Sequence, residues 1–231
     1  MSIRLLIPMF ALFLALPLCA QQETKPLDNT TRETMEWCNM WWDHAPDTTL
    51  PRVLLMGDSI ANQYSAETRK RLAGKANVDL LATSKSMCDP ALLREVETMV
   101  TGYNYKVIHF NNGLHGFHLS DADYEAGLRR LVALLQKLQP QAKLLWANCT
   151  PVVVANDVAT LSPGNATVLR RNATAAPVMA ELGIPITDLY SISVDHPEYR
   201  NNGDGYHYNQ AGKVVQAELV SKVIADALQT P

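Results

Sequence analysis

The chain has 231 residues, 47% of them hydrophobic, and a formal net charge of −3. Its length and apolar content predict one globular domain with a hydrophobic core of its own. The one basic cluster, in residues 68–75, has the spacing of a solvated helix face, so neither nucleic acid nor an anionic membrane surface is expected as a partner.

Residues 1–20 have the layout of a secretory signal peptide. A short positive start, "MSIR", precedes the apolar run "LLIPMFALFLALPL", and Ala20 stands where cleavage is expected. The run is short for a membrane span and contains two prolines. Cys19 raises the alternative of a lipoprotein, which the bulky Leu18 before it disfavours. We therefore expect export to the periplasm or the extracellular space, with no membrane contact after cleavage.

Residues 21–50 form a less regular segment that carries three tryptophans within "EWCNMWWDHAP". Large aromatic side chains bury much apolar area, so this N-terminal segment is expected to pack on the core of the domain. The alternative is an aromatic platform that binds a ligand.

Export places the cysteines in an oxidising compartment, where disulfides persist. Removal of residues 1–20 leaves Cys38, Cys88 and Cys149, an odd number. Cys149 ends an apolar stretch and is expected to be buried, which leaves Cys38 with Cys88 as the candidate disulfide. The sequence has no C-x-x-C spacing and no cluster of histidines and cysteines, so no metal site is expected.

From residue 51 to residue 231 the sequence predicts one α/β domain. Short apolar stretches alternate with longer ones of helical spacing, such as residues 123–138 and 209–228. This alternation predicts a three-layer sandwich, with a flavodoxin-like five-stranded parallel sheet and helices on both faces. The expected strands are residues 52–57, 77–83, 106–110, 143–148 and 184–190.

The first of these strands runs into "GDS" and then into a helical pattern. Parallel sheets of this class place their chemistry at the carboxyl ends of the strands, where Ser59 is expected to lie. The backbone N–H of Ser59 then lies at a helix N-terminus, which favours negative charge. The alternative is that Asp58 or Ser59 only caps the helix.

Near the end of the chain, "DGYHYNQAG" puts Asp204 three residues before His207. A serine hydroxyl becomes a good nucleophile when an imidazole takes its proton, and a carboxylate fixes the tautomer of that imidazole. A loop before the last helix can carry both groups to the sheet edge that holds Ser59. Taken alone, the stretch is equally typical of an ordinary loop.

Together, "GDS" and "DGYH" followed by "NQAGK" resemble the two conserved end blocks of the SGNH (GDSL) hydrolases, and the likeness covers residues 51–227. The entry "LPRVLLMGDSI" is similar to the carbohydrate-esterase branch of that family. The resemblance implies that Ser59 is the nucleophile, His207 the general base and then acid, and Asp204 the carboxylate that orients it.

The resemblance also implies an oxyanion hole made by the N–H of Ser59, a backbone N–H after the second strand and an asparagine after the third. No glycine follows the second strand, and Cys88 is the candidate donor there. The stretch "FNNGLHG" is similar to the Asn-x-Gly-His variant of plant polysaccharide O-acetyltransferase relatives. That variant favours Asn111 and the usual block favours Asn112, so both remain candidates.

His115 is a candidate for substrate binding, and His118 is a further candidate for lining the pocket. The resemblance implies a serine esterase that needs no cofactor and removes small acyl groups, above all acetyl groups from carbohydrate. A monomer is expected, and secretion is expected from residues 1–20. The alternatives are a lipid or thioester hydrolase, a sugar O-acyltransferase of the same fold, and a carbohydrate-binding protein without catalysis.

Overall fold

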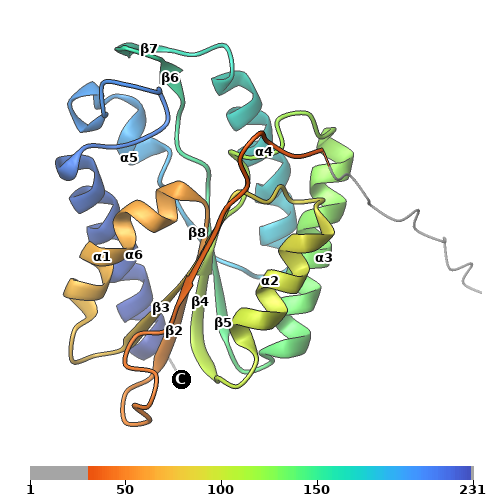
Figure 1. Ribbon diagram of the computed structural model, residues 1–231, viewed down its shortest axis with the longest axis vertical. Coiled ribbons are helices and arrows are strands. Elements are labelled where there is room, and N and C mark those ends of the chain that lie inside the picture. The colour runs from red at the N-terminus through yellow and green to blue at the C-terminus, as the bar shows by residue number, and fades with distance from the viewer. Residues whose placement is uncertain (1–30, 230–231) are drawn as a thin grey trace, which may run out of the picture.

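The computed structural model describes residues 31–229, which form a three-layer α/β sandwich (Figure 1). The central sheet has six strands in the order β1-β3-β2-β4-β5-β8. The parallel strands follow the flavodoxin-like order, with β3 outside β2. The strands are β1 (Cys38–Trp41), β2 (Arg52–Gly57), β3 (Asn77–Thr83), β4 (Tyr105–Phe110), β5 (Lys143–Ala147) and β8 (Ile186–Thr187).

Helices cover both faces of this sheet, as the sequence predicts. On one face, α1 and α6 share an apolar core with the sheet; on the other, α2, α3 and α4 do so. Because both faces are covered, every residue of β2 and β3 is buried, which is why most of the residues in these strands are apolar. The helices are α1 (Ser59–Leu72), α2 (Pro90–Val100), α3 (Asp121–Leu138), α4 (Asn165–Glu181), α5 (Ser191–Val194) and α6 (Gln210–Gln229), with a 3₁₀ turn at η1 (Pro197–Tyr199).

The N-terminal segment corrects the prediction of a five-stranded, wholly parallel sheet. Its strand β1 pairs antiparallel with β3, so that Cys38 lies opposite Thr83. Trp37 and Trp41 pack on the α1 side, and Trp42 packs on the other side, as the alternation of a strand requires. Three tryptophans in one short segment indicated that it packs on the core, but not that its backbone extends the sheet.

A short hairpin of β6 (Val153–Val154) and β7 (Asp157–Leu161) lies beyond the carboxyl ends of the parallel strands (Figure 1). No helix within residues 31–229 combines the length and apolar character needed to cross a membrane. Residues 1–20, where a signal peptide is expected, lie outside the described residues.

The predicted disulfide between Cys38 and Cys88 is wrong: both are free thiols. Cys38 is exposed on the edge strand β1, whereas Cys88 is buried and its thiol donates to the carbonyl of Asp123, 3.2 Å away. The two side chains therefore face different surroundings. Cys149 is a free, buried thiol, as predicted.

Candidate active site

Ser59 is the first residue of α1, immediately after the tight connection from β2. The side chain of Asp58 caps this helix by accepting from the N–H of Ile60 at 2.9 Å. Gly57 leaves room for the turn, because a Cβ there would come within 2.8 Å of the Cβ of Ala61. The hydroxyl of Ser59 thus lies at the carboxyl edge of the sheet and at a helix N-terminus.

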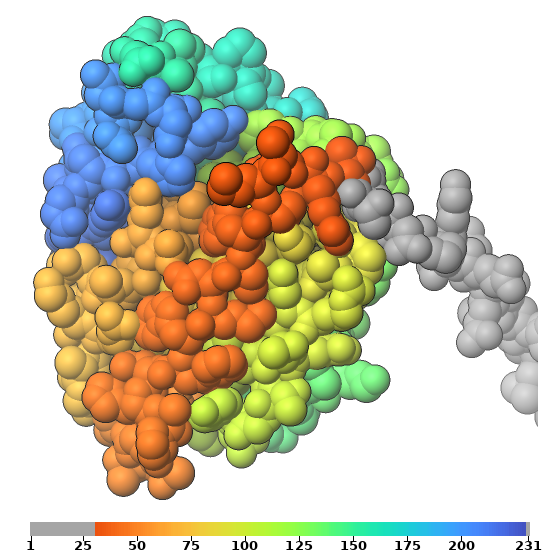
Figure 2. All heavy atoms as spheres, in the orientation of Figure 1, coloured from red at the N-terminus to blue at the C-terminus, as the bar shows by residue number. Residues whose placement is uncertain are grey.

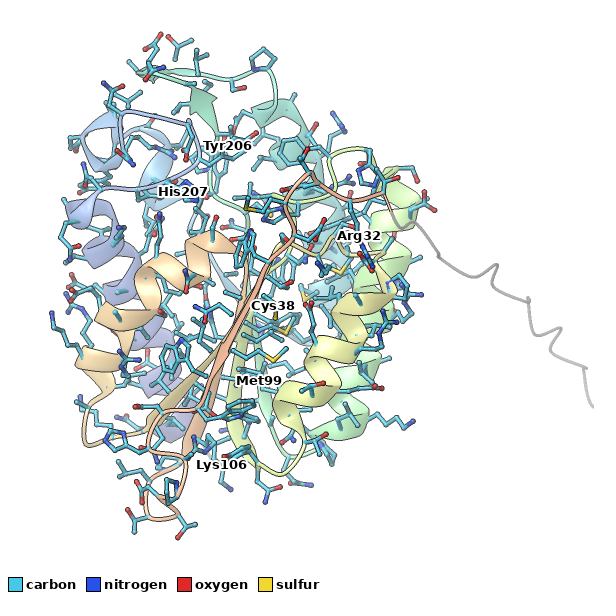
Figure 3. The ribbon with its side chains drawn as sticks, viewed as in Figure 1. Arg32, Cys38, Met99, Lys106, Tyr206 and His207 are labelled. Atoms are coloured by element: carbon cyan, nitrogen blue, oxygen red, sulfur yellow. The ribbon has the colours of Figure 1, made fainter. Side chains whose placement is uncertain are left out.

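The structure brings the three predicted triad residues together. Ser59 Oγ lies 2.8 Å from His207 Nε2, and His207 Nδ1 is hydrogen-bonded to Asp204 Oδ2. The other oxygen of Asp204 accepts from the N–H groups of Tyr206, at 2.9 Å, and of His207, at 3.1 Å. The carboxylate therefore holds both the loop backbone and the imidazole that faces the serine. Figure 3 labels Tyr206 and His207 towards one end of the molecule and Lys106, at the start of β4, towards the other.

Two carboxyl groups near the hydroxyl have opposite electrostatic surroundings. Burial raises the pKa of Asp204, but hydrogen bonds from Tyr206 and His207 outweigh it, and the net pKa lies below its ordinary value. Burial raises the pKa of Asp58, whose Oδ2 has no partner within the described part of the chain. Asp204 is thus the carboxylate that stays ionised at neutral pH and can stabilise a positive imidazole.

The loop that carries Asp204 and His207 is clamped by the hairpin. The N–H of Val153, in β6, donates to the carbonyl of Gly205 at 2.9 Å. Gly205 has φ +82°, and a Cβ there would lie 2.2 Å from the carbonyl oxygen of Val153. Only glycine fits this close, left-handed turn, which explains the residue between the acid and the base in the sequence.

Ser59 and His207 open into a pocket of about 660 Å³. A second depression of about 250 Å³ shares three of its lining residues, so the hollow continues past the serine. The N-terminal segment crosses this face between the layers of helices (Figure 2). The pocket is lined by Glu33, Trp37, Ser59, Asn62, Gln63, Leu114, His115, Tyr206 and His207.

Of the predicted oxyanion residues, Ser59 lines this pocket, whereas Asn111, Asn112 and Cys88 are not among its lining residues. The amide nitrogen of Asn111 donates to the carbonyl of Ala147 at 2.6 Å, and that of Asn112 donates to the carbonyl of Lys85 at 2.8 Å. Cys88 is fully buried. These three residues brace the loops after β3 and β4, and their assignment as oxyanion donors stays a prediction.

Ser86 lies closer to the pocket than Cys88 does on the loop after β3. It lines the second depression, and its buried hydroxyl has no hydrogen-bond partner among residues 31–229. Nothing in the sequence singles out Ser86, because a serine within "TSKSMCD" carries no signal that separates it from its neighbours.

His115, predicted to bind substrate, lies in the pocket wall. Its Nδ1 is 2.6 Å from Glu33 Oε1, and its ring packs edge-on against Trp37 with 6.2 Å between centroids. His118 lines the second depression instead. The sequence did not point to Glu33, since 82 residues separate it from His115 and no motif links them.

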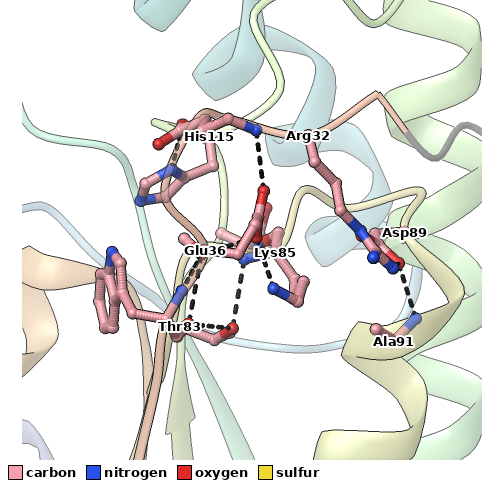
Figure 4. Close-up of polar contacts among 11 residues, drawn as sticks. Arg32, Glu36, Thr83, Lys85, Asp89, Ala91 and His115 are labelled. Carbon is pink, nitrogen blue, oxygen red and sulfur yellow. Dashed lines mark hydrogen bonds and ion pairs between the residues drawn. The ribbon is translucent and has the colours of Figure 1, made fainter.

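Residues 32–37, here named the N-terminal strap, are fixed to the loop after β3 by polar contacts (Figure 4). Glu36 accepts from Lys85 Nζ and from Ser84 Oγ, the latter at 2.8 Å. Arg32 donates to Asp89, the residue that caps α2, at 2.8 Å. The strap is therefore held at both of its ends, with Glu33 between them. Within residues 31–229, no group of three His, Cys, Asp or Glu side chains is arranged to hold a metal ion.

No protein-family model and no curated protein matches the sequence. Solved structures do match. A carbohydrate esterase family 3 structure from Talaromyces cellulolyticus has a TM-score of 0.64 at 15% identity, over 79% of this chain and all (100%) of that one. An acetyl xylan esterase has a TM-score of 0.61 at 16% identity, over 75% of this chain and 99% of that one.

A GDSL-like lipase from Bacteroides thetaiotaomicron has a TM-score of 0.61 at 13% identity, over 79% of this chain and 91% of that one. At such low identities these matches establish the fold and not the activity. The chain has the fold of the SGNH (GDSL) hydrolases, as the two sequence blocks indicated.

Proposed function

We propose that this chain is an esterase that uses Ser59 as nucleophile, His207 as general base and acid, and Asp204 as the carboxylate that orients the imidazole. The observation that carries the proposal is the continuous line of hydrogen bonds from Asp204 through His207 to Ser59, the last two of which line a pocket. If Ser59 served only to start or cap the helix, its hydroxyl would not require a hydrogen bond to an imidazole that is itself bonded to a carboxylate.

In the first half of the proposed reaction, Ser59 Oγ attacks the ester carbonyl carbon while His207 Nε2 takes the hydroxyl proton. The N–H of Ser59, at the start of α1, is a donor for the oxyanion of the tetrahedral intermediate. When the bond to the alcohol breaks, His207 returns the proton to the leaving oxygen. Asp204, with its lowered pKa, stabilises the imidazolium between these two transfers.

In the second half, water attacks the acyl-enzyme and His207 takes its proton. Collapse of the new intermediate frees the carboxylic acid and restores the serine, with the proton passing back to Oγ. The steps balance without a redox partner or a cofactor.

The proposed substrates are small acyl esters of carbohydrate, acetyl esters in particular. Two of the structural neighbours reported above are carbohydrate-active esterases by name. The pocket lining also suits a sugar, because Trp37 and Tyr206 offer aromatic surfaces beside the amides of Asn62 and Gln63. We further propose export, on the signal-peptide pattern of residues 1–20.

Acetate release from acetylated xylan, pectin and simple sugar acetates tests the proposal, with Ser59→Ala as the control. We expect release by the native chain and none by the variant. A series of p-nitrophenyl esters of rising chain length, run beside it, separates a short-acyl esterase from a lipid hydrolase. Acyl transfer to added sugar in place of acetate release would identify an acyltransferase, and no turnover of any ester would identify a binding protein.

A further inference from the structure

The pocket contains a second imidazole that the proposed mechanism does not use. We infer, on the basis of the proposed esterase function, that His115 accepts a hydrogen bond from a free hydroxyl of the leaving alcohol. Glu33 of the N-terminal strap holds the imidazole of His115 in the tautomer that can accept this bond. The site is thereby specific for esters of polyhydroxyl alcohols, such as partly acetylated sugars.

The position of His115 suits a contact with the alcohol. It lines the same pocket as Ser59 and His207, on the loop that follows β4, and its side chain is 15% exposed. The hydroxyl of Ser59 is already hydrogen-bonded to His207, and no hydrogen bond joins His115 to the serine within the described residues. The second imidazole therefore lines the pocket without being hydrogen-bonded to the proposed nucleophile.

Glu33 sets the hydrogen-bonding character of His115. An ionised carboxylate only accepts hydrogen bonds, so the proton of a neutral imidazole lies on the Nδ1 that faces Glu33 Oε1 at 2.6 Å. That arrangement leaves the lone pair on Nε2. No side chain or backbone group in residues 31–229 bonds this nitrogen, so it is an acceptor available to a ligand.

Two amides in the same pocket lining, those of Asn62 and Gln63, supply complementary donors. The side-chain oxygen of Asn62 accepts from Asn39 at 2.9 Å, and that of Gln63 accepts from the N–H of Tyr208 at 3.2 Å. Both amides thus hold their oxygens on the protein and keep their NH₂ groups uncommitted within the described chain. Hydroxyl groups both donate and accept, so a polyol fits a pocket whose lining offers both NH₂ donors and an imidazole acceptor.

Two anchors of the strap make Glu33 a positioning residue. Its own N–H donates to Glu36 Oε1 at 2.8 Å, and Glu36 is bonded to Lys85. On the other side, Arg32 is bonded to Asp89. The carboxylate is therefore carried on a fixed backbone, although its side chain is 53% exposed.

Two esters of one sugar test this inference. The first is a monoacetylated methyl xylopyranoside with its other hydroxyls free, and the second is the same ester with those hydroxyls methylated. We expect His115→Phe, which keeps a ring and removes the acceptor, to reduce the preference for the free ester, measured as the ratio of the two kcat/KM values, by about tenfold. That is the size expected for one hydrogen bond to a ligand hydroxyl.

Glu33→Gln tests the positioning role, because it keeps the shape of the side chain but lets the imidazole adopt either tautomer. We expect a smaller loss of the same ratio, about threefold, mainly through KM. His196→Phe is the matched control: His196 forms a similar pair with Glu198, 2.8 Å apart, outside the pocket lining. It should leave the ratio at the native value.

An unchanged ratio in His115→Phe, in a protein that still hydrolyses p-nitrophenyl acetate, overturns the inference and leaves the esterase proposal standing. If His115→Phe does not fold, Glu33→Ala is the second test. It removes the carboxylate that holds His115, and because the Glu33 side chain is exposed the fold should tolerate the change. An unchanged ratio of the two kcat/KM values in Glu33→Ala overturns the inference equally. A native chain that hydrolyses neither sugar ester nor p-nitrophenyl acetate overturns the proposed function itself, and the inference with it.

Discussion

The pocket is flanked by two carboxylate–imidazole pairs that differ in how the chain builds them. Asp204 and His207 lie three residues apart on one loop, and their imidazole reaches the hydroxyl of Ser59. Glu33 and His115 come from the N-terminal strap and the loop after β4, and their imidazole reaches no protein hydroxyl. Similar chemistry thus has two expected roles, proton transfer in the first pair and alcohol binding in the second. The proposed nucleophile, Ser59, lies beside the first pair and makes the difference.

The largest effect is expected when the hydroxyl of Ser59, the proposed nucleophile, is removed. Ser59→Ala leaves both imidazoles in place, and we expect kcat for p-nitrophenyl acetate to fall by about 10⁶-fold, the usual cost of losing a triad serine. Because a smaller side chain at the first residue of α1 leaves the cap at Asp58 intact, the unfolding temperature should stay near the native value. Steady-state kinetics with a thermal melt check this. Substantial activity in the folded variant means that the two pairs do not differ as described.

The next effect concerns the orienting carboxylate. In Asp204→Asn the amide oxygen still accepts from the N–H groups of Tyr206 and His207, so the loop stays folded. The amide NH₂ then faces His207 Nδ1 and stabilises the wrong tautomer, and we expect kcat to fall by about 10⁴-fold. Since the lowered pKa of Asp204 keeps it ionised from pH 5 to 9, the loss should persist across this range. A kcat/KM profile measures it; native activity in the variant contradicts the triad.

The sequence predicted the first pair because its chemistry is local. An acid and a base within one loop, and a serine directly after a buried strand, are visible as spacings along the chain. The flavodoxin-like sheet was predictable for a related reason. Strands that are buried on both faces consist mostly of apolar residues, and such stretches can be recognised in the sequence. The edge strand β1 was not predictable, because Cys38 and Asn39 are exposed and only Met40 and Trp41 pack on the cores, which leaves no continuous apolar run.

The second pair depends on contacts that no local pattern records. His115 was a candidate because it stands in a stretch that resembles a loop block of the SGNH hydrolases. Glu33 became its partner through the course of the strap over the loop after β3. The lack of any local pattern for contacts between distant residues also explains why the predicted disulfide was wrong. Elimination paired Cys38 with Cys88, whereas the fold puts one on an exposed edge strand and the other under α3.

A smaller effect is expected at the loop that carries His115, which starts with Asn111 and Asn112. Both hydrogens of the Asn111 amide face acceptors, Ala147 O at 2.6 Å and Cys149 Sγ at 3.8 Å, whereas Asn112 uses one, on Lys85 O. Asn112 therefore keeps a hydrogen for the oxyanion, and Asn112→Ala should lower kcat by about 10²–10³-fold.

Asn111→Ala is the matched comparison for that measurement. We expect it to lower the unfolding temperature, because the buried carbonyl of Ala147 loses its donor, while kcat changes little. The reverse pattern assigns the oxyanion to Asn111, and native kcat in both variants removes this block from the oxyanion hole.

The smallest expected effect tests whether the second pair depends on the strap. Burial raises the pKa of Glu36, but hydrogen bonds from Lys85 and Ser84 outweigh it, and the net pKa is below the ordinary 4.5. A carboxyl group whose pKa is lowered by folding stabilises the protein fully at pH values above its unfolded pKa. This contribution is lost as the pH falls through the folded pKa. At pH 7 we expect Glu36→Gln to lower the unfolding temperature by about 2–4 °C, and the gap to close towards pH 3.

Glu181→Gln is the control for this pH series, because Glu181 pairs with Arg129 in a more exposed setting, where ion pairs contribute little. The ester preference distinguishes the two pairs in the same variants. Loosening the strap displaces Glu33 but leaves the loop of Asp204 untouched, so Glu36→Gln should reduce the preference for the free sugar ester more than it reduces hydrolysis of the methylated one. If both esters lose activity equally, the strap supports the whole pocket. The two pairs are then coupled through it, and the separation of their roles fails.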